Sequence, residues 1–176
     1  MLMHSHVKQG ERQLTDINKL CEEFSSLAIT GMKATQDAIN CEFVKSLDNS
    51  LPLASIIPQE ISRVIINIMN NAFYAVKQKS LLSPEFMPVV SLTTQKQAKF
   101  ISIQIKDNGE GISQKNIDKI FEPFFTTKPA GDGTGLGLSI CYDIVKKHGG
   151  DIKVTSKENE FTAFTILLPV DRKSVV

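Results

Sequence analysis

The chain has 176 residues, of which 41% are hydrophobic and 22% are charged, and its formal net charge is +1. This composition is typical of one globular domain with a buried core, and the small net charge argues against a broad basic surface for nucleic acid. No apolar run reaches the ~18 residues of a membrane span and no signal peptide is visible, so we expect a cytoplasmic domain without membrane contact. Cys21, Cys41 and Cys141 are widely spaced, which indicates reduced core residues and not a metal site.

The first half of the chain predicts two long helices with a strand between them. Residues 16–32 carry apolar side chains at helical spacing. Residues 41–47 alternate and predict a strand, whereas residues 51–57 contain a proline and predict a loop with a short extended piece. Residues 59–79 predict the second helix, because a proline suits its first turn and an apolar stripe follows.

The second half predicts two β-hairpins separated by two helices. Ser113 is placed to cap the first of these helices, which is short. The strands are predicted at residues 89–94, 100–106, 151–156 and 161–168, and the helices at residues 114–120 and 135–148.

Asp107 directly follows an alternating strand, so its carboxylate lies at a strand end, where ligands are often bound. A carboxylate there can accept a hydrogen bond from the exocyclic amine of adenine. Gly109 and Gly111 lack a Cβ, which lets the backbone take a positive φ and approach a flat ring. Ile112 can supply an apolar face for that ring. The run DNGEGI therefore predicts a pocket for a purine base.

A second glycine-rich run leads directly into the helix predicted for residues 135–148. Glycines at a helix start leave bare N–H groups and the positive end of the helix dipole facing outward, which suits phosphate oxygens. A plain turn and helix cap is the alternative interpretation of such a loop taken alone. Two glycine-rich runs separated by an aromatic segment indicate a nucleotide pocket more specifically than one such run does. This run consists of Gly133, Thr134, Gly135, Leu136, Gly137 and Leu138.

Asn67 and Asn71 lie four residues apart on the helix predicted for residues 59–79, beside its apolar stripe. The stripe can pack on the sheet while both amides point toward the pocket edge. An amide oxygen can bind Mg²⁺ without adding negative charge beside a triphosphate. The alternative is that the amides cap or bridge backbone groups near the helix end. Tyr74, on the same helix, fits a residue at the pocket rim.

An aromatic segment with Phe121, Phe124 and Phe125 precedes the second glycine-rich run. Its rings can be core residues, the base of a flap over the pocket, or both. The following residues are rich in glycine and proline and lack an apolar anchor, so we expect a mobile flap. Lys128 is the only cation in that flap, and its ammonium can pair with a β- or γ-phosphate oxygen or remain solvated.

The motifs DNGEGI, FEPFFTTK and GTGLGLSI, with INIMNNA upstream, resemble the G1, F, G2 and N boxes of the catalytic ATP-binding domain of sensor histidine kinases. That family shares the Bergerat fold with gyrase, heat-shock chaperone and mismatch-repair ATPases. The resemblance covers about residues 15–170. It implies a two-layer α/β sandwich, in which a mixed sheet of about five strands carries three main helices on one face, with a mobile lid over ATP.

The resemblance also implies that ATP and Mg²⁺ are the cofactors and assigns roles to the site residues. Asn71 matches the Mg²⁺ ligand, Asp107 matches the residue that fixes adenine, and Thr162 matches a threonine near that aspartate, although Phe161 replaces the usual preceding glycine. Asn67, Asn71 and Lys128 are the expected catalytic residues. The remaining expected ATP contacts are Tyr74, Gly109, Gly111, Ile112, Phe124, Thr126, Thr127, Gly133, Thr134, Gly135, Leu136, Gly137 and Leu138.

The family pattern divides the chain at residue 14. Residues 1–14 resemble the end of a dimerisation hairpin, and residues 15–176 form the catalytic domain. His4 and His6 are not followed by an acidic residue, as the phosphoaccepting histidine usually is. We therefore expect this chain to phosphorylate a histidine on a dimerisation domain that it mostly lacks. A response regulator would act downstream, and the parent protein can be membrane-anchored.

Two other functions compete with this interpretation. In gyrase-like ATP hydrolases, a glutamate at the position of Asn67 activates water, and an asparagine cannot take that proton. A serine-kinase-type anti-sigma factor or a degenerate nucleotide sensor is the other alternative. Intact Asn71, Asp107 and Lys128 argue against degeneracy.

Overall fold

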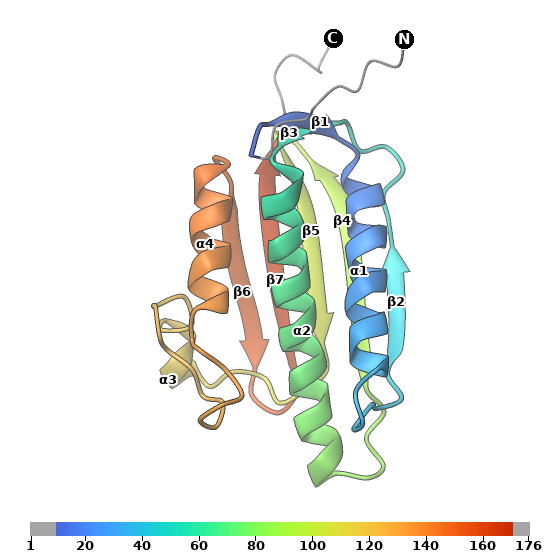
Figure 1. The fold of residues 1–176 in the computed structure, drawn as a ribbon, viewed down its shortest axis with the longest axis vertical. Helices are drawn as coiled ribbons and strands as arrows, with labels where there is room; N and C mark the ends of the chain where they lie inside the picture. The colour runs from blue at the N-terminus through green and yellow to red at the C-terminus, as the bar shows by residue number, and fades with distance from the viewer. Residues whose placement is uncertain (1–9, 171–176) are drawn as a thin grey trace.

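The computed structural model describes residues 10–170. Three long helices cover one face of a five-stranded sheet with the order β2-β4-β5-β7-β6 (Figure 1). β2 and β4 are parallel and the other neighbours are antiparallel, so the predicted mixed-sheet α/β sandwich is confirmed. In chain order the elements are β1 Gln13–Thr15, α1 Ile17–Lys33, β2 Glu42–Ser46, β3 Ala54–Ile56, α2 Pro58–Leu82, β4 Val89–Gln97, β5 Phe100–Asp107, α3 Gln114–Ile117, α4 Gly137–Lys147, β6 Asp151–Lys157 and β7 Phe161–Pro169.

The central strand β5 shows how the sheet positions a polar group among apolar ones. Ile101, Ile103 and Ile105 are at most 1% exposed and belong to the core, whereas Lys106 is exposed on the other face. Burying each such side chain contributes about 1.5–3 kcal/mol. Because alternate residues of a strand share a face, Asp107 ends β5 on the helix-covered face and is 4% exposed.

Helix α2 lies between α1 and α4 and contacts the middle of the sheet (Figure 1). Its apolar stripe is buried as the helical spacing predicts, and Pro58 occupies the first turn. The side of the same helix that flanks this stripe borders the cavity described below. The stripe consists of Ile61, Ile65, Ile68, Ala72 and Val76.

The N-terminal part of the described chain differs from the prediction. Residues 1–14 were expected to resemble the end of a helical dimerisation hairpin, but within the described residues β1 begins at Gln13 and pairs antiparallel with β3. The Arg12 guanidinium donates to the carbonyl oxygens of Ser55 and Lys147, each at 3.1 Å, and so links β3 to the end of α4. His4 and His6 lie outside the described residues, and the division of the chain at residue 14 stays a prediction.

Two helices are shorter than their patterns predict. α3 ends at Ile117, and Ser113 precedes it without a side-chain capping bond. The chain leaves the helix through a tight turn, in which the Lys119 N–H donates to Asn116 O at 2.8 Å, and Ile120 then enters the core. α4 begins at Gly137, because Gly135 has a φ of +72° and cannot be helical.

Candidate nucleotide-binding site

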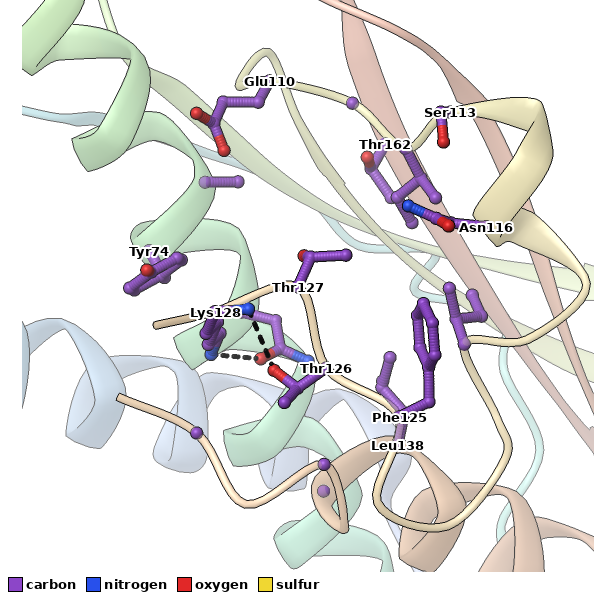
Figure 2. Close-up of a pocket in the computed structure, with 18 of the residues that line it drawn as sticks. Tyr74, Glu110, Ser113, Asn116, Phe125, Thr126, Thr127, Lys128, Leu138 and Thr162 are labelled. Atoms are coloured by element: carbon purple, nitrogen blue, oxygen red, sulfur yellow. Dashed lines mark hydrogen bonds between the residues drawn. The ribbon is translucent and has the colours of Figure 1, made fainter. Parts of the chain in front are cut away.

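A cavity of about 530 Å³ lies between α2, the segment from β5 to α3, the loop of residues 125–135 and the start of α4 (Figure 2). This volume is within the usual range for small-molecule sites. The cavity brings most of the predicted site residues together, although they come from segments far apart in the sequence. The predicted residues that line it are Asn71, Tyr74, Asp107, Gly111, Ile112, Thr126, Thr127, Lys128, Gly133, Thr134, Gly135, Gly137, Leu138 and Thr162.

We call the part of the cavity around Asp107, Ile112 and Thr162 the inner end. One Asp107 carboxylate oxygen accepts from the Gly109 N–H at 2.8 Å. Burial raises the pKa of Asp107 to about 7, while the Gly109 hydrogen bond and the charge of Lys79 oppose this shift. A buried carboxyl group at the wall of a cavity is a candidate for ligand binding.

Two glycines let the turn after Asp107 approach its neighbours. A Cβ on Gly109 would lie 2.6 Å from the backbone carbon of Ala75, so any side chain there would collide with α2. Gly111 has a φ of +70°, and a Cβ on it would collide with the carbonyl of Lys157. The glycines therefore fit the turn between α2 and the β6–β7 hairpin, and Gly109 itself does not line the cavity.

Lys79, near the end of α2, holds the same turn from outside. Its ammonium donates to the carbonyl oxygens of Asn108 at 3.2 Å, Gly109 at 3.5 Å and Asn159 at 2.7 Å. It also lies 4.7 Å above the ring of Phe86. One side chain thus joins the turn after β5 to the turn between β6 and β7.

Thr162 lies beside Asp107 in the wall of the inner end. It pairs directly with Asp107 across β5 and β7, and it is 4% exposed. Residues opposite each other in an antiparallel pair lie on the same face of the sheet. Ser156 on β6 contacts the Thr162 hydroxyl at 3.0 Å and accepts from the Ile112 N–H at 2.8 Å.

We call the part of the cavity around Asn71, Tyr74, Lys128 and the start of α4 the outer end. The Lys128 ammonium donates to the Asn71 side-chain oxygen at 3.2 Å and lies 4.4 Å above the Tyr74 ring (Figure 2). Partial burial lowers the pKa of Lys128, and the charge of Asp132 opposes this shift. The predicted phosphate cation therefore contacts the predicted Mg²⁺ ligand directly.

The glycine-rich run forms the other wall of the outer end. Gly135 has a φ of +72°, and its carbonyl accepts from the Phe124 N–H at 2.8 Å. The Leu136 N–H donates to the Thr134 hydroxyl at 3.3 Å. Leu136 precedes α4 and has no polar side chain to cap the helix, so the N–H groups of the first turn suit an anion.

The structure does not bring every predicted residue into the cavity. Asn67 faces α4, where its amide nitrogen donates to the Cys141 sulfur at 3.7 Å. Phe124 has a φ of +67° and is 74% exposed, so its ring points away, whereas Phe125 lines the cavity. Leu136 and Gly109 border the cavity without lining it.

Several residues of the site were not among the predicted site residues. Glu110, Ser113, Asn116 and Asn159 line the cavity. Ser156 and Lys79 support it from the second layer. The sequence contains a signal for both Ser156 and Lys79. Lys79 lies two four-residue steps after Asn71 on the same helix, and Ser156 is a polar residue on the strand face that also carries Ile152.

Comparisons with known proteins show which family the chain is similar to. Residues 57–172 match the model of the family described as histidine kinase-, DNA gyrase B-, and HSP90-like ATPase. The chain is 34% identical over 159 residues to the sensor histidine kinase ZraS of Escherichia coli strain K12, covering 90% of this chain and 31% of ZraS. It is 34% identical over 172 residues to the histidine-protein kinase AtoS of the same strain, covering 97% of this chain and 26% of AtoS.

A solved structure gives the same result for the fold. The catalytic domain of histidine kinase ThkA superposes with a TM-score of 0.72 at 28% identity, and the match covers 90% of this chain and 97% of that domain. The chain therefore belongs to the histidine kinase-, DNA gyrase B- and HSP90-like ATPase family. Within it, the relatives and the fold identify a nucleotide-binding catalytic domain of the sensor histidine kinase type.

The chain spans about a third or less of the length of these curated relatives. Within residues 10–170, no helix combines the length and apolar character that crossing a membrane requires.

Proposed function

We propose that this chain binds Mg-ATP and donates its γ-phosphoryl group to a histidine of a dimerisation domain. The observation that carries the proposal is that one cavity has acceptors for a base at its inner end and groups suited to phosphates at its outer end. Asp107 and Thr162 would bind adenine. Lys128 and the start of α4 would bind the phosphates.

The donor set at the outer end fits Mg²⁺. The Asn71 oxygen faces the cavity and already accepts from a cation, the Lys128 ammonium. A single oxygen ligand suits Mg²⁺, which usually takes few protein ligands and completes its coordination with substrate phosphates and waters. When bound, Mg²⁺ would neutralise phosphate charge.

The chemistry of this domain would be positioning and electrostatics. Asp107 would hold the base, and Lys128 and the N–H groups of α4 would stabilise the charge of the transferring group. The nucleophile would come from the dimerisation domain, and a response regulator would receive the phosphoryl group later. We place this domain in the cytoplasm, with a parent protein that can be membrane-anchored.

The geometry does not favour ATP hydrolysis. Asn67 stands where a hydrolase would carry its general base, and an amide cannot take a proton from water. Its side chain instead contacts Cys141 at 3.7 Å, outside the cavity lining. ATP bound in this cavity would therefore not be hydrolysed before a protein nucleophile reaches its γ-phosphate.

Phosphoryl transfer to a separately supplied dimerisation hairpin tests the proposal. We expect the chain, given Mg²⁺ and radiolabelled ATP, to label the histidine of such a hairpin from a relative and hardly to label itself. The Asn71→Ala variant should lower the transfer rate about a hundredfold, while binding of ADP without Mg²⁺ changes little.

Two outcomes would contradict the proposal. Stoichiometric labelling of this chain alone would place the acceptor within it. Steady phosphate release at a rate that the hairpin does not affect would support a hydrolase. A titration with a Mg²⁺-bound, non-cleavable ATP analogue checks binding separately from transfer.

A further inference from the structure

Ser156 lies behind the inner end, on β6, and is buried. Its hydroxyl oxygen has three neighbours within hydrogen-bond distance. These are the Ile112 N–H at 2.8 Å, the Phe161 carbonyl oxygen at 2.7 Å and the Thr162 hydroxyl at 3.0 Å. A serine hydroxyl has one hydrogen to donate and two lone pairs that accept, so these three contacts use it completely.

The direction of each hydrogen bond follows from the chemistry of the neighbours. The Phe161 carbonyl can only accept, so at 2.7 Å the single Ser156 hydrogen must lie between the two oxygens. The Ile112 N–H can only donate, and it takes one lone pair of Ser156. The Thr162 hydroxyl must therefore donate to the other lone pair.

Thr162 is thereby left with lone pairs and no hydrogen for the cavity that it lines. We propose that Ser156 is a specificity-determining positioning residue: it orients the Thr162 hydroxyl so that the inner end presents only acceptors to the base. Asp107, directly opposite Thr162 in the sheet, is the second acceptor.

This arrangement selects an exocyclic amine over a keto oxygen. The amine of adenine offers donors to both acceptors, whereas a keto oxygen at the same ring position places acceptor against acceptor. Buried groups that are left without partners give strong discrimination between similar substrates. The inference rests on the proposed function, because it assumes that the base occupies the inner end.

Competition between ATP and inosine triphosphate tests the inference. Inosine triphosphate carries a keto oxygen in place of the amine, and both affinities are measured by calorimetry at about pH 8, where Asp107 is ionised. The wild-type chain should prefer ATP. Ser156→Ala frees the Thr162 hydroxyl to donate to the keto oxygen, so we expect the preference to fall about tenfold. If the alanine variant folds poorly, Ser156→Cys takes its place. A cysteine sulfur accepts hydrogen bonds only weakly, so the preference for ATP should fall in this variant too.

A double-mutant cycle separates positioning from a general structural role. Thr162→Val removes the hydroxyl, and in that background Ser156→Ala should change the preference no further. Thr155→Ala, an exposed neighbour on the same strand, is the matched control and should leave the preference unchanged. An unchanged preference in Ser156→Ala, or an equal further fall in the Thr162→Val background, would overturn the inference. Failure of the wild-type chain to bind ATP would instead reject the proposed function.

Discussion

The two ends of the cavity are built differently. The inner end is made from adjacent strands and a turn that α2 holds in place, and Asp107, Thr162 and Ser156 are all buried there. The outer end depends on a loop whose residues 129–132 are all exposed, with Lys128 as its contact to α2. Groups that are fixed by packing and hydrogen bonds need little reorganisation when a ligand binds, whereas an exposed loop can change conformation at small cost.

This difference suggests a division of work between the ends. The inner end can recognise the base with a geometry that exists before nucleotide binds. The outer end must adapt, because the Asn71 oxygen that would bind Mg²⁺ accepts from Lys128. Substitutions of Asp107, Lys79 and Lys128 can break or sharpen this comparison, and the largest effect is expected at the rigid inner end.

Asp107→Asn should abolish most nucleotide binding, with a loss of about a hundredfold or more in ATP affinity, because an NH₂ donor replaces one carboxylate oxygen and the oxygen that remains also accepts from the Gly109 N–H. Its pKa of about 7 also predicts a pH dependence in the wild-type chain. As pH falls below about 7, protonation removes the acceptor, so ATP affinity should fall by up to about tenfold per pH unit. Calorimetry between about pH 6 and pH 8 checks both results, and a wild-type affinity that is flat over this range would contradict them.

The same substitution should stabilise the domain. The folded pKa of Asp107 is raised from 3.8 to about 7, so the folded state binds more protons than the unfolded state in this window. Stability is therefore lost as pH rises from about 4 to about 7. Asp107→Asn removes this cost, on the order of 2–4 kcal/mol at about pH 8 and close to zero at about pH 4. Denaturant unfolding at the two pH values measures the difference.

Lys79→Met should make the turn after β5 less rigid, so that the inner end, like the outer end, has to reorganise when nucleotide binds. The variant loses three hydrogen bonds to carbonyl oxygens and a positive charge that lowers the pKa of Asp107. We expect ATP affinity to fall about tenfold and the pH midpoint of binding to rise. Lys79→Arg keeps the charge and should restore the midpoint. Lys77→Met, which removes an ion pair with Asp37 at 3.7 Å, is the control.

Equal losses of ATP affinity in Lys77→Met and Lys79→Met would show a general effect of removing charge from α2. An unchanged pH midpoint in Lys79→Met would show that the lysine supports only the fold. Either result would show that Lys79 is not a cause of the rigidity of the inner end.

The fold was predictable because its long elements carry strong periodic signals. The isoleucines of β5 alternate, and the apolar stripe of α2 repeats at helical spacing. β1 was missed because three residues cannot show a period, and its partner β3 is about forty residues away. The cavity residues within DNGEGI and GTGLGLSI were predictable because glycines and a carboxylate mark such loops locally.

The supporting residues were not predictable in the same way. Lys79 binds the carbonyl of Asn159, and Ser156 binds the N–H of Ile112, so each acts across segments that only the folded chain brings together. The orientations of Asn67 and Phe124 were likewise set by tertiary contacts. Asn67 is one turn from Asn71 but packs against α4, and the positive φ of Phe124 turns its ring outward.

The smallest effect is expected at the outer end, from Lys128→Met. The ammonium that would bind phosphate also occupies the Asn71 oxygen, so its removal weakens phosphate binding and at the same time frees the metal ligand. These effects oppose each other, and we expect ATP affinity to fall only about threefold while adenosine affinity is unchanged. Lys157→Met, which removes an exposed ion pair with Glu160 at 2.9 Å, is the matched control. An equal loss for adenosine and ATP would place Lys128 at the base instead of the phosphates, and the outer end would then not be a separate, adaptable part of the site.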